Sequence, residues 1–325
     1  MKARSGKPVT ASRGASRSWN WWAVLRQVVA FAVLAGLVFL MFQVTSTNLQ
    51  ERGVRTGFDF LSRPAVTPVL TSPLEFELGV STAARALAAG ALNTLKLTAA
   101  TIVLSTLAGL LVGLGSLAHN PLARRVCTVY VEAMRNVPVL LHIVFWYGLV
   151  LSLPPLSAVR DAEFILASNR GIFLFPTVQG FSVHALVSMT PEFAALFLGI
   201  SLYTAAFIAE IVRSAVGSIP TGQWEACKAL GLSRRTTLVR VVGPQAVRVG
   251  LPALASEYLG VFKNSSLALV IGYQDFMAVG DTMLTDTGHA IEIMALVMLF
   301  YGVIGLCMSA VMHWFERRQH VWSRT

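Results

Sequence analysis

Six strongly apolar runs constrain the fold of this chain more than any other feature of its sequence. They cover residues 21–44, 92–117, 137–153, 193–216, 251–273 and 290–314. A helix of about 20 apolar residues is long enough to cross a bilayer. Hydrophobic residues make up 55% of the chain and charged residues only 13%, against about 25% charged in an average soluble domain. The sequence therefore predicts an all-α integral membrane protein with about six transmembrane helices.

The distribution of basic residues predicts the orientation of these helices. Of the 26 Lys and Arg residues, 17 fall in the two terminal segments and in the intervals 118–136 and 213–248, and six fall in the other intervals. Because basic residues accumulate in cytoplasmic loops, we expect both termini in the cytoplasm. The interval with Asp275, Asp281 and Asp286 has no Lys or Arg, so we expect it to be an outer loop. The net charge of +10 comes mainly from segments that flank the membrane, so it indicates contact with membrane lipid and not with nucleic acid.

The same pattern divides the chain into four expected segments. Residues 1–20 form a basic cytoplasmic tail, and 21–89 hold the first transmembrane helix and an outer loop. A transmembrane domain follows over 90–315, and 316–325 form a cytoplasmic C-terminal tail. Within the domain, the spacing Gly109-x-x-x-Gly113 predicts a surface on which a second helix packs closely.

The interval after the fourth apolar run is polar and basic, and its sequence predicts two short helices. Thr221 is a candidate N-cap, and Gly231 can adopt the left-handed conformation that ends a helix. Ser233 is a second candidate N-cap, for a helix that we expect to stop at Gly243-Pro244. Such a hairpin can lie on lipid headgroups or dock on a partner protein, and its shape alone leaves both interpretations open.

Part of this interval resembles the EAA loop of ATP-binding-cassette (ABC) importer permeases. The pattern of that loop is Glu-Ala-Ala, three residues, Gly, nine residues, Ile, one residue, Leu-Pro. In this chain Glu225 and Ala226 open the match, Gly231 follows at the required spacing, and Pro244 ends it. Three positions depart from the pattern by small or apolar replacements: Cys227, Val241 and Gly243.

Further segments resemble the polar amino-acid uptake permeases, in particular the HisM-like branch for general or acidic L-amino acids. They are 203–213, 222–226, 244–248 and 263–267, with 93–94, 130–132, 135–138, 146–147 and 169–171 upstream and a weaker match at 58–61. The resemblance covers 90–315. It implies a MetI-like ABC importer core, to which this chain adds one N-terminal helix.

The resemblance also implies a function: the membrane-spanning permease subunit of an amino-acid importer in a bacterial inner membrane. The partners that it implies are a cytoplasmic ATPase, a second permease subunit, homologous or identical, and a periplasmic solute-binding protein. It places coupling to the ATPase on the hairpin, at Trp224, Glu225, Ala226, Gly231, Arg234 and Pro244.

Ionisable and polar residues inside the apolar runs are candidates for the solute path, because burying them in a membrane is costly. Glu257, Lys263, Asn264, Ser265 and Ser266 interrupt the fifth run. Hydrogen bonding between helices is an equally good explanation for such residues.

A second pair of ionisable residues lies at the end of the fourth run. Glu210 and Arg213 are three residues apart, so they can pair on one helix face, and we favour a structural role for this pair.

Motifs for catalysis are absent from the sequence. It contains no Gly-x4-Gly-Lys-Ser/Thr loop for ATP and no His-Glu-x-x-His or Gly-x-Ser-x-Gly signature. The three cysteines lack ligand spacing, so we expect neither a metal site nor a cofactor. An ion-coupled secondary amino-acid carrier is the alternative function, and a non-transporting membrane scaffold is a third possibility. A long inverted repeat would favour the carrier, and none is found.

Overall fold

The computed structural model describes residues 21–51, 57–66, 69, 74–159, 164–179 and 182–321. The predicted basic tail at 1–20 lies outside these residues. Residues 1–56 and 57–325 form two separate units. The first unit contains a single described helix, α1 (Trp21–Glu51), whose apolar stretch Val24–Met41 is long enough to cross a membrane. This helix corresponds to the predicted first span.

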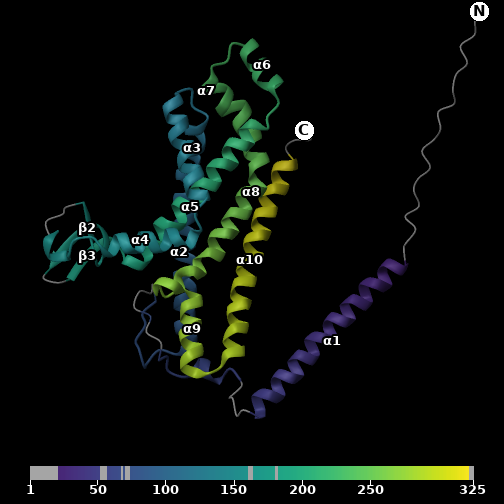
Figure 1. The fold of residues 1–325 in the computed structure, drawn as a ribbon, viewed down its shortest axis with the longest axis vertical. Coiled ribbons are helices and arrows are strands. Elements are labelled where there is room, and N and C mark those ends of the chain that lie inside the picture. The colour runs from purple at the N-terminus through teal and green to yellow at the C-terminus, as the bar shows by residue number, and fades with distance from the viewer. Residues whose placement is uncertain are drawn as a thin grey trace, which may run out of the picture. The chain divides into compact units, whose positions relative to one another are not determined.

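The second unit is a bundle of helices (Figure 1). Its longer helices are α2 (Ala83–Ser116), α3 (Pro121–Arg135), α4 (Val139–Leu151), α5 (Pro191–Gly217), α8 (Gly243–Asn264), α9 (Phe276–Thr287) and α10 (Ala290–Val321). Short helical pieces complete it: η1 (Asp59–Ser62), η2 (Leu156–Ala158), α6 (Thr221–Ala229), α7 (Arg234–Thr237), η3 (Leu238–Val242) and η4 (Ser265–Ile271).

The packing of α2 against α5 forms the centre of the bundle. A Cβ atom added at Gly109 would lie 2.6 Å from Ile208 Cβ, and one added at Gly113 would lie 2.8 Å from Val212 Cβ. Only glycine therefore allows this approach of the two helices, and the predicted close-packing surface is confirmed. α4 also approaches α5 closely, because a Cβ atom at Gly199 would lie 3.1 Å from Ile143 Cα.

The third predicted span, 137–153, is not one crossing helix. Its helix, α4, has 13 residues and is about 20 Å long, too short for a hydrocarbon core of about 30 Å. The preceding interval, which we expected to be a cytoplasmic loop, forms helix α3, and the two helices meet at a bend of 102°. Pro138 explains the break, since a proline disfavours the helical conformation in the residue before it.

The fifth predicted span and the outer loop after it also differ from expectation. α8 covers Gly243–Asn264 and continues as the 3₁₀ helix η4, which Gly272 ends with φ 77°. We expected an outer loop around Asp275, Asp281 and Asp286, but this segment is mostly helix α9, which packs against α2 and α10. Asp275 is its N-cap and is fully buried, which the prediction of an exposed loop did not anticipate.

A small sheet is the exception to the all-α prediction. In the interval 154–190, β1 (Ile165–Ser168), β2 (Gly171–Gln179) and β3 (Ser182–Met189) form an antiparallel sheet in the order β1-β2-β3. Ser168 pairs with Gly171, so Asn169 and Arg170 form a two-residue turn between β1 and β2. Helices nevertheless dominate the fold.

By length and apolarity, four helices of the described chain can cross a membrane: α1, α2, α5 and α10. The bent pair of α3 and α4 makes a fifth if it counts as one broken span. The remaining predicted crossing corresponds to α8, which carries Arg248, Glu257 and Lys263 and is not among these apolar helices.

Candidate functional site: the α6–α7 hairpin

The predicted hairpin exists, and a glycine makes its turn. α6 ends at Ala229, and Gly231 follows with φ 69°, the left-handed conformation that the sequence predicts. The amide of Leu232 donates a hydrogen bond to the carbonyl of Cys227 at 3.0 Å, which closes the end of α6. The prediction for Thr221 is wrong by one residue: Pro220 occupies the N-cap position, and Thr221 is the first residue of the helix.

The second helix begins as predicted. The Ser233 hydroxyl accepts a hydrogen bond from the amide of Thr236 at 3.2 Å, which confirms the N-cap. It does not stop at Gly243-Pro244, however. α7 passes into a π-helical turn, η3, and then into α8, so α7, η3 and α8 form one continuous helical segment.

Gly243 makes this continuation possible. Its amide donates to the carbonyl of Leu238, five residues earlier, and a Cβ atom at Gly243 would lie 2.5 Å from that oxygen. Pro244 has no amide hydrogen to donate and would be expected to break a regular helix, but the wider π turn accommodates it. Pro244 becomes one of the first residues of α8 and is exposed.

One face of the hairpin is fixed to the bundle. Cys227 is 5% exposed, and Trp224 packs beside a buried cluster formed by Ala215, Val216, Ile219, Val242 and Ala246. The guanidinium of Arg234 donates to the carbonyl of Leu117 at 3.0 Å and also contacts His119 Nε2. Because Leu117 is the C-cap of α2, this arginine places positive charge at the negative end of a long helix.

The opposite face of the hairpin is open. Glu225, Ala226 and Lys228 are exposed, and Leu230 at the turn is 77% exposed. A cleft of about 610 Å³ lies between α6, α7 and the turn that follows α2, and it is lined by His119, Trp224, Glu225, Lys228, Leu232, Arg234 and Thr237. The fold thus brings three predicted coupling residues, Trp224, Glu225 and Arg234, around a single cleft. An exposed carboxylate beside exposed apolar side chains is suited to contact another protein.

The residues predicted for the solute path lie along α8 and its extension η4. Glu257 is half-buried, Lys263 is exposed, and neither has an ion pair within the described chain. Ser265 Oγ donates to the carbonyl of Phe262 at 2.7 Å, and Ser266 Oγ donates to that of Lys263 at 2.8 Å. Both hydroxyls therefore bond to their own helix, as serines in helices often do.

Arg135 has contacts that the sequence did not predict, since it entered the analysis only through the charge of its loop and the resemblance at 135–138. Its guanidinium lies 5.1 Å from the centre of the Phe207 ring and 3.9 Å from the Glu210 carboxylate, and its charge acts on Glu257. Its place in the segment 135–138, just before the apolar run, was the signal in the sequence that pointed to a role for this arginine.

Glu210 also pairs with Arg213, as predicted. Arg213 Nε donates to Glu210 Oε2 at 3.0 Å, and Ser214 Oγ donates to Oε1 at 3.2 Å. These contacts hold the Glu210 carboxylate at the α5 end nearest the hairpin.

These features define a class: a helical membrane protein that carries a helical hairpin, fixed on one face and open on the other, between two long helices. Residues 105–321 match the model of the family described as "Binding-protein-dependent transport system inner membrane component". This chain belongs to that family. It is a membrane-spanning transport component.

Similar proteins agree with this assignment. The chain is 34% identical to the "Putative amino-acid ABC transporter permease protein YhdX" of Escherichia coli (strain K12), over 93% of this chain and 94% of the relative. It is 33% identical to the "General L-amino acid transport system permease protein AapQ" of Rhizobium johnstonii, over 94% of each.

Solved structures have the same fold. A chain from the "Crystal structure of an amino acid ABC transporter with histidines" matches with a TM-score of 0.57 and 25% identity, over 72% of this chain and 94% of that one. A chain of the MetNI methionine ABC transporter in an inward-facing conformation matches with a TM-score of 0.54 and 17% identity, over 73% and 97%. At that identity the second match supports the fold alone.

Proposed function

We propose that this chain is the permease subunit of a bacterial ABC importer for polar amino acids, acidic or general L-amino acids. The observation that carries the proposal is the α6–α7 hairpin, which exposes Glu225 while its other face is fixed to α2, α5 and α8. The names of the two relatives described above support an amino acid as the solute.

The proposal includes three protein partners. A separate cytoplasmic ATPase receives the hairpin and hydrolyses ATP, a second permease subunit completes the pathway, and a periplasmic binding protein delivers the solute. Both termini and the hairpin then lie in the cytoplasm, which the 17 to six distribution of Lys and Arg supports. Glu225 meets a basic residue of the ATPase, since a carboxylate at a protein interface is stabilised by an opposite charge.

The hairpin transmits movement because it is joined to the bundle on several sides. Closure of the ATPase around ATP displaces α6 and α7, and the continuous helix through η3 carries that displacement into α8. The close contact at Gly109 and Gly113 moves α2 and α5 together. Packed helices that shift as rigid bodies can open the solute pathway to one side of the membrane at a time.

For the solute path we propose the polar side chains of α8 and its extension: Glu257, Lys263, Asn264, Ser265 and Ser266. The neighbourhood of Glu257 adds Arg135 from another helix. A polar amino acid carries both an ammonium and a carboxylate group, so a path that offers charges of both signs on different helices suits this class of solute.

Reconstitution tests the function against the ion-coupled carrier. The chain, purified from native membranes with its associated subunits, is placed in proteoliposomes, and uptake of labelled glutamate, glutamine and aspartate is measured. We expect uptake only with internal ATP and external binding protein, and no effect of an ionophore that dissipates ion gradients. Uptake driven by an imposed ion gradient without ATP would overturn the proposal in favour of the carrier.

A further inference from the structure

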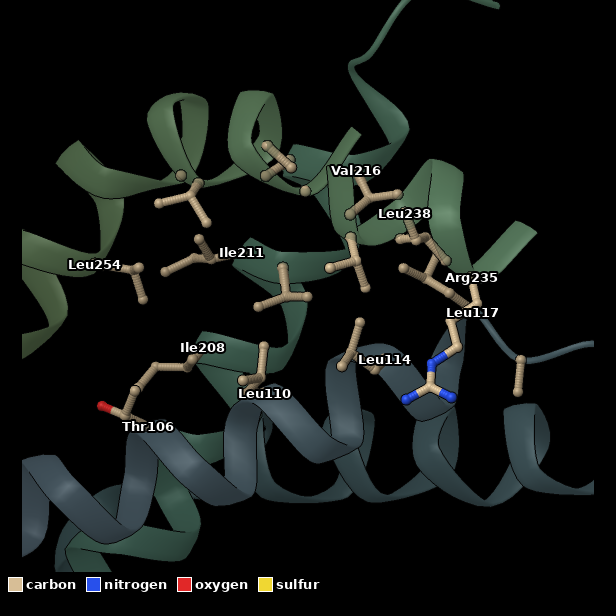
Figure 2. Close-up of a pocket in the computed structure, with 18 of the residues that line it drawn as sticks. Thr106, Leu110, Leu114, Leu117, Ile208, Ile211, Val216, Arg235, Leu238 and Leu254 are labelled. Carbon is tan, nitrogen blue, oxygen red and sulfur yellow. The ribbon is translucent and has the colours of Figure 1, made fainter. Parts of the chain in front are cut away.

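A second cavity lies beside the hairpin and is almost entirely apolar. It has a volume of about 650 Å³ and lies between α2, α5 and the helical segment from α7 to α8 (Figure 2). Aliphatic side chains from all three sides project into it, among them Leu110 and Leu114 of α2, Ile208 and Ile211 of α5, and Leu254 of α8. Such a lining excludes a polar solute, because it offers no partners for polar groups.

The cavity has the length of one membrane leaflet. Its lining on α2 extends from Thr106 to Leu117. At a rise of about 1.5 Å per residue this distance is about 16 Å, close to half of a hydrocarbon core of about 30 Å. Leu117 is the C-cap of α2 and lies beside the hairpin. With the hairpin at the membrane surface, as the proposed function has it, the cavity reaches from that surface towards the membrane centre.

The surface end of the cavity is basic. His119, Arg234 and Arg235 line it there, at the level of Leu117. Arg234 is occupied by its contacts with Leu117 and His119. No hydrogen bond or ion pair engages the guanidinium of Arg235 within the described part of the chain. Figure 2 shows its guanidinium at the Leu117 end, below the helix that carries it.

We propose that this cavity binds an anionic phospholipid, with one acyl chain between α2, α5 and α8 and the phosphate at Arg235. The cation at one end and the aliphatic lining along the rest match the two parts of such a lipid. The inference uses the proposed function only for the location of the hairpin, at a membrane surface.

The charge at the surface end favours a phospholipid over a protein helix as the occupant. A helix would need a carboxylate opposite Arg235, whereas a phospholipid presents its phosphate at the level where Arg235 lies.

Native mass spectrometry of the full chain in a neutral detergent tests the headgroup. Palmitoyl-oleoyl phosphatidylglycerol and palmitoyl-oleoyl phosphatidylcholine are added separately, and bound lipid is counted. We expect one phosphatidylglycerol per chain, retained more tightly than phosphatidylcholine. Arg235→Gln should weaken phosphatidylglycerol binding about fivefold, the usual contribution of one basic residue at a membrane surface. The matched control, Arg240→Gln, changes an exposed arginine that does not line the cavity and should leave binding unchanged.

A second pair of variants tests the acyl chain. Leu114→Trp fills the cavity and should reduce retention of both lipids, whereas Leu111→Trp changes an exposed residue of the same helix outside the cavity and should not. Melting temperatures of all variants check that the fold is kept. Equal binding by Arg235→Gln and wild type, or by the two lipids, would overturn the proposal.

A photo-reactive residue at position 114 distinguishes the remaining occupants. An adduct with the mass of a phospholipid supports the proposal, and a cross-link to another polypeptide or to α1 refutes it. Both readouts are independent of uptake, so a failure here is distinct from a failure of the proposed transport function.

Discussion

The bundle carries two polar helical connections at opposite ends (Figure 1). Their polar groups differ in burial and in bonding. In the connection that leads into α9, the polar groups are buried and bonded to other helices. In the α6–α7 hairpin they are exposed, and the Glu225 and Lys228 side chains have no bond within the described residues. Polar residues therefore make a fixed joint in one place and an open surface in the other.

The joint at α9 is a network that reaches α2 and α10. Asp275 Oδ1 accepts from the amide of Ala278 at 2.8 Å, and Oδ2 accepts from Tyr301 Oη at 3.1 Å. From α2, Thr94 Oγ1 accepts from the amide of Phe276 at 3.0 Å. Buried polar groups that are all paired fix one arrangement, whereas exposed ones are free to bind a partner. The comparison predicts loss of stability at the joint and loss of coupling at the hairpin.

The largest expected effect is on coupling, in Glu225→Lys. Reversing one charge of an interface pair costs about 2–5 kcal/mol, so hydrolysis stimulated by the binding protein should fall at least about 30-fold in the assembled complex. The chain should still insert, and its melting temperature should stay unchanged because Glu225 is exposed. Glu132→Lys reverses an exposed charge on α3 and serves as the control. Normal stimulated hydrolysis in Glu225→Lys would remove Glu225 from the interface.

Asp275→Ala should give the converse result. It removes a helix cap and a bond to Tyr301 from a fully buried position, at a cost of about 2–4 kcal/mol in the free energy of unfolding. Thermal unfolding in detergent measures this loss. Asp281→Ala, on the same helix but only half-buried, should change the free energy by less than about 0.5 kcal/mol. Equal losses in the two variants would show that the joint is not what stabilises this end.

Substitutions at Gly231 test the backbone of the hairpin turn without changing the side chains on the hairpin surface. A side chain in the left-handed conformation costs about 1–2 kcal/mol, and a β-branched one meets more steric resistance than alanine. Uptake should therefore fall in the order wild type, Gly231→Ala, Gly231→Val. A Cβ atom at Gly231 meets nothing within 4 Å, so the effect would come from the backbone and not from a clash. Gly222→Ala, in α6 and equally unhindered, should be neutral; similar uptake by both Gly231 variants would contradict the argument.

The smallest expected effect is at the start of α7. Ser233→Ala removes the N-cap and should destabilise this short helix by about 1 kcal/mol. Hydrogen exchange at the amide of Thr236, which the Ser233 hydroxyl now binds, should become faster, with the melting temperature of the whole chain unchanged. Ser256→Ala, on an exposed face of α8, should not alter that exchange rate. A protected Thr236 amide in Ser233→Ala would show that the cap does not hold the helix.

The two connections also differ in how far the sequence could predict them. The hairpin is encoded locally: Gly231 and Ser233 act within their own turns, so their roles follow from the sequence. The joint depends on Thr94 and Tyr301, which are distant in sequence from Asp275 and meet it only in the folded bundle. Asp275 directly before an apolar segment was an N-cap signal, but an interval with three aspartates and no basic residue favoured an outer loop.

The prediction that a helix stops at Gly243-Pro244 was wrong for a different reason. Glycine followed by proline is the usual end of a helix, and the local rule is sound for an α-helix. A π turn changes the hydrogen-bonding partner of Gly243 to Leu238, five residues back, and thereby removes the conflict. Val242 in this turn is fully buried, and burial against other helices cannot be predicted from the residues of the turn alone.

The bond from Arg234 to the end of α2 gives the hairpin a third support. The chain itself joins the hairpin to α5 before Pro220 and to α8 through η3, and two supports define an axis about which a rigid piece can rotate. Arg234 adds a third attachment, to the C-terminal end of α2. A load on the hairpin is then shared by three helix ends, and the hairpin can only be pushed or tilted together with all of them.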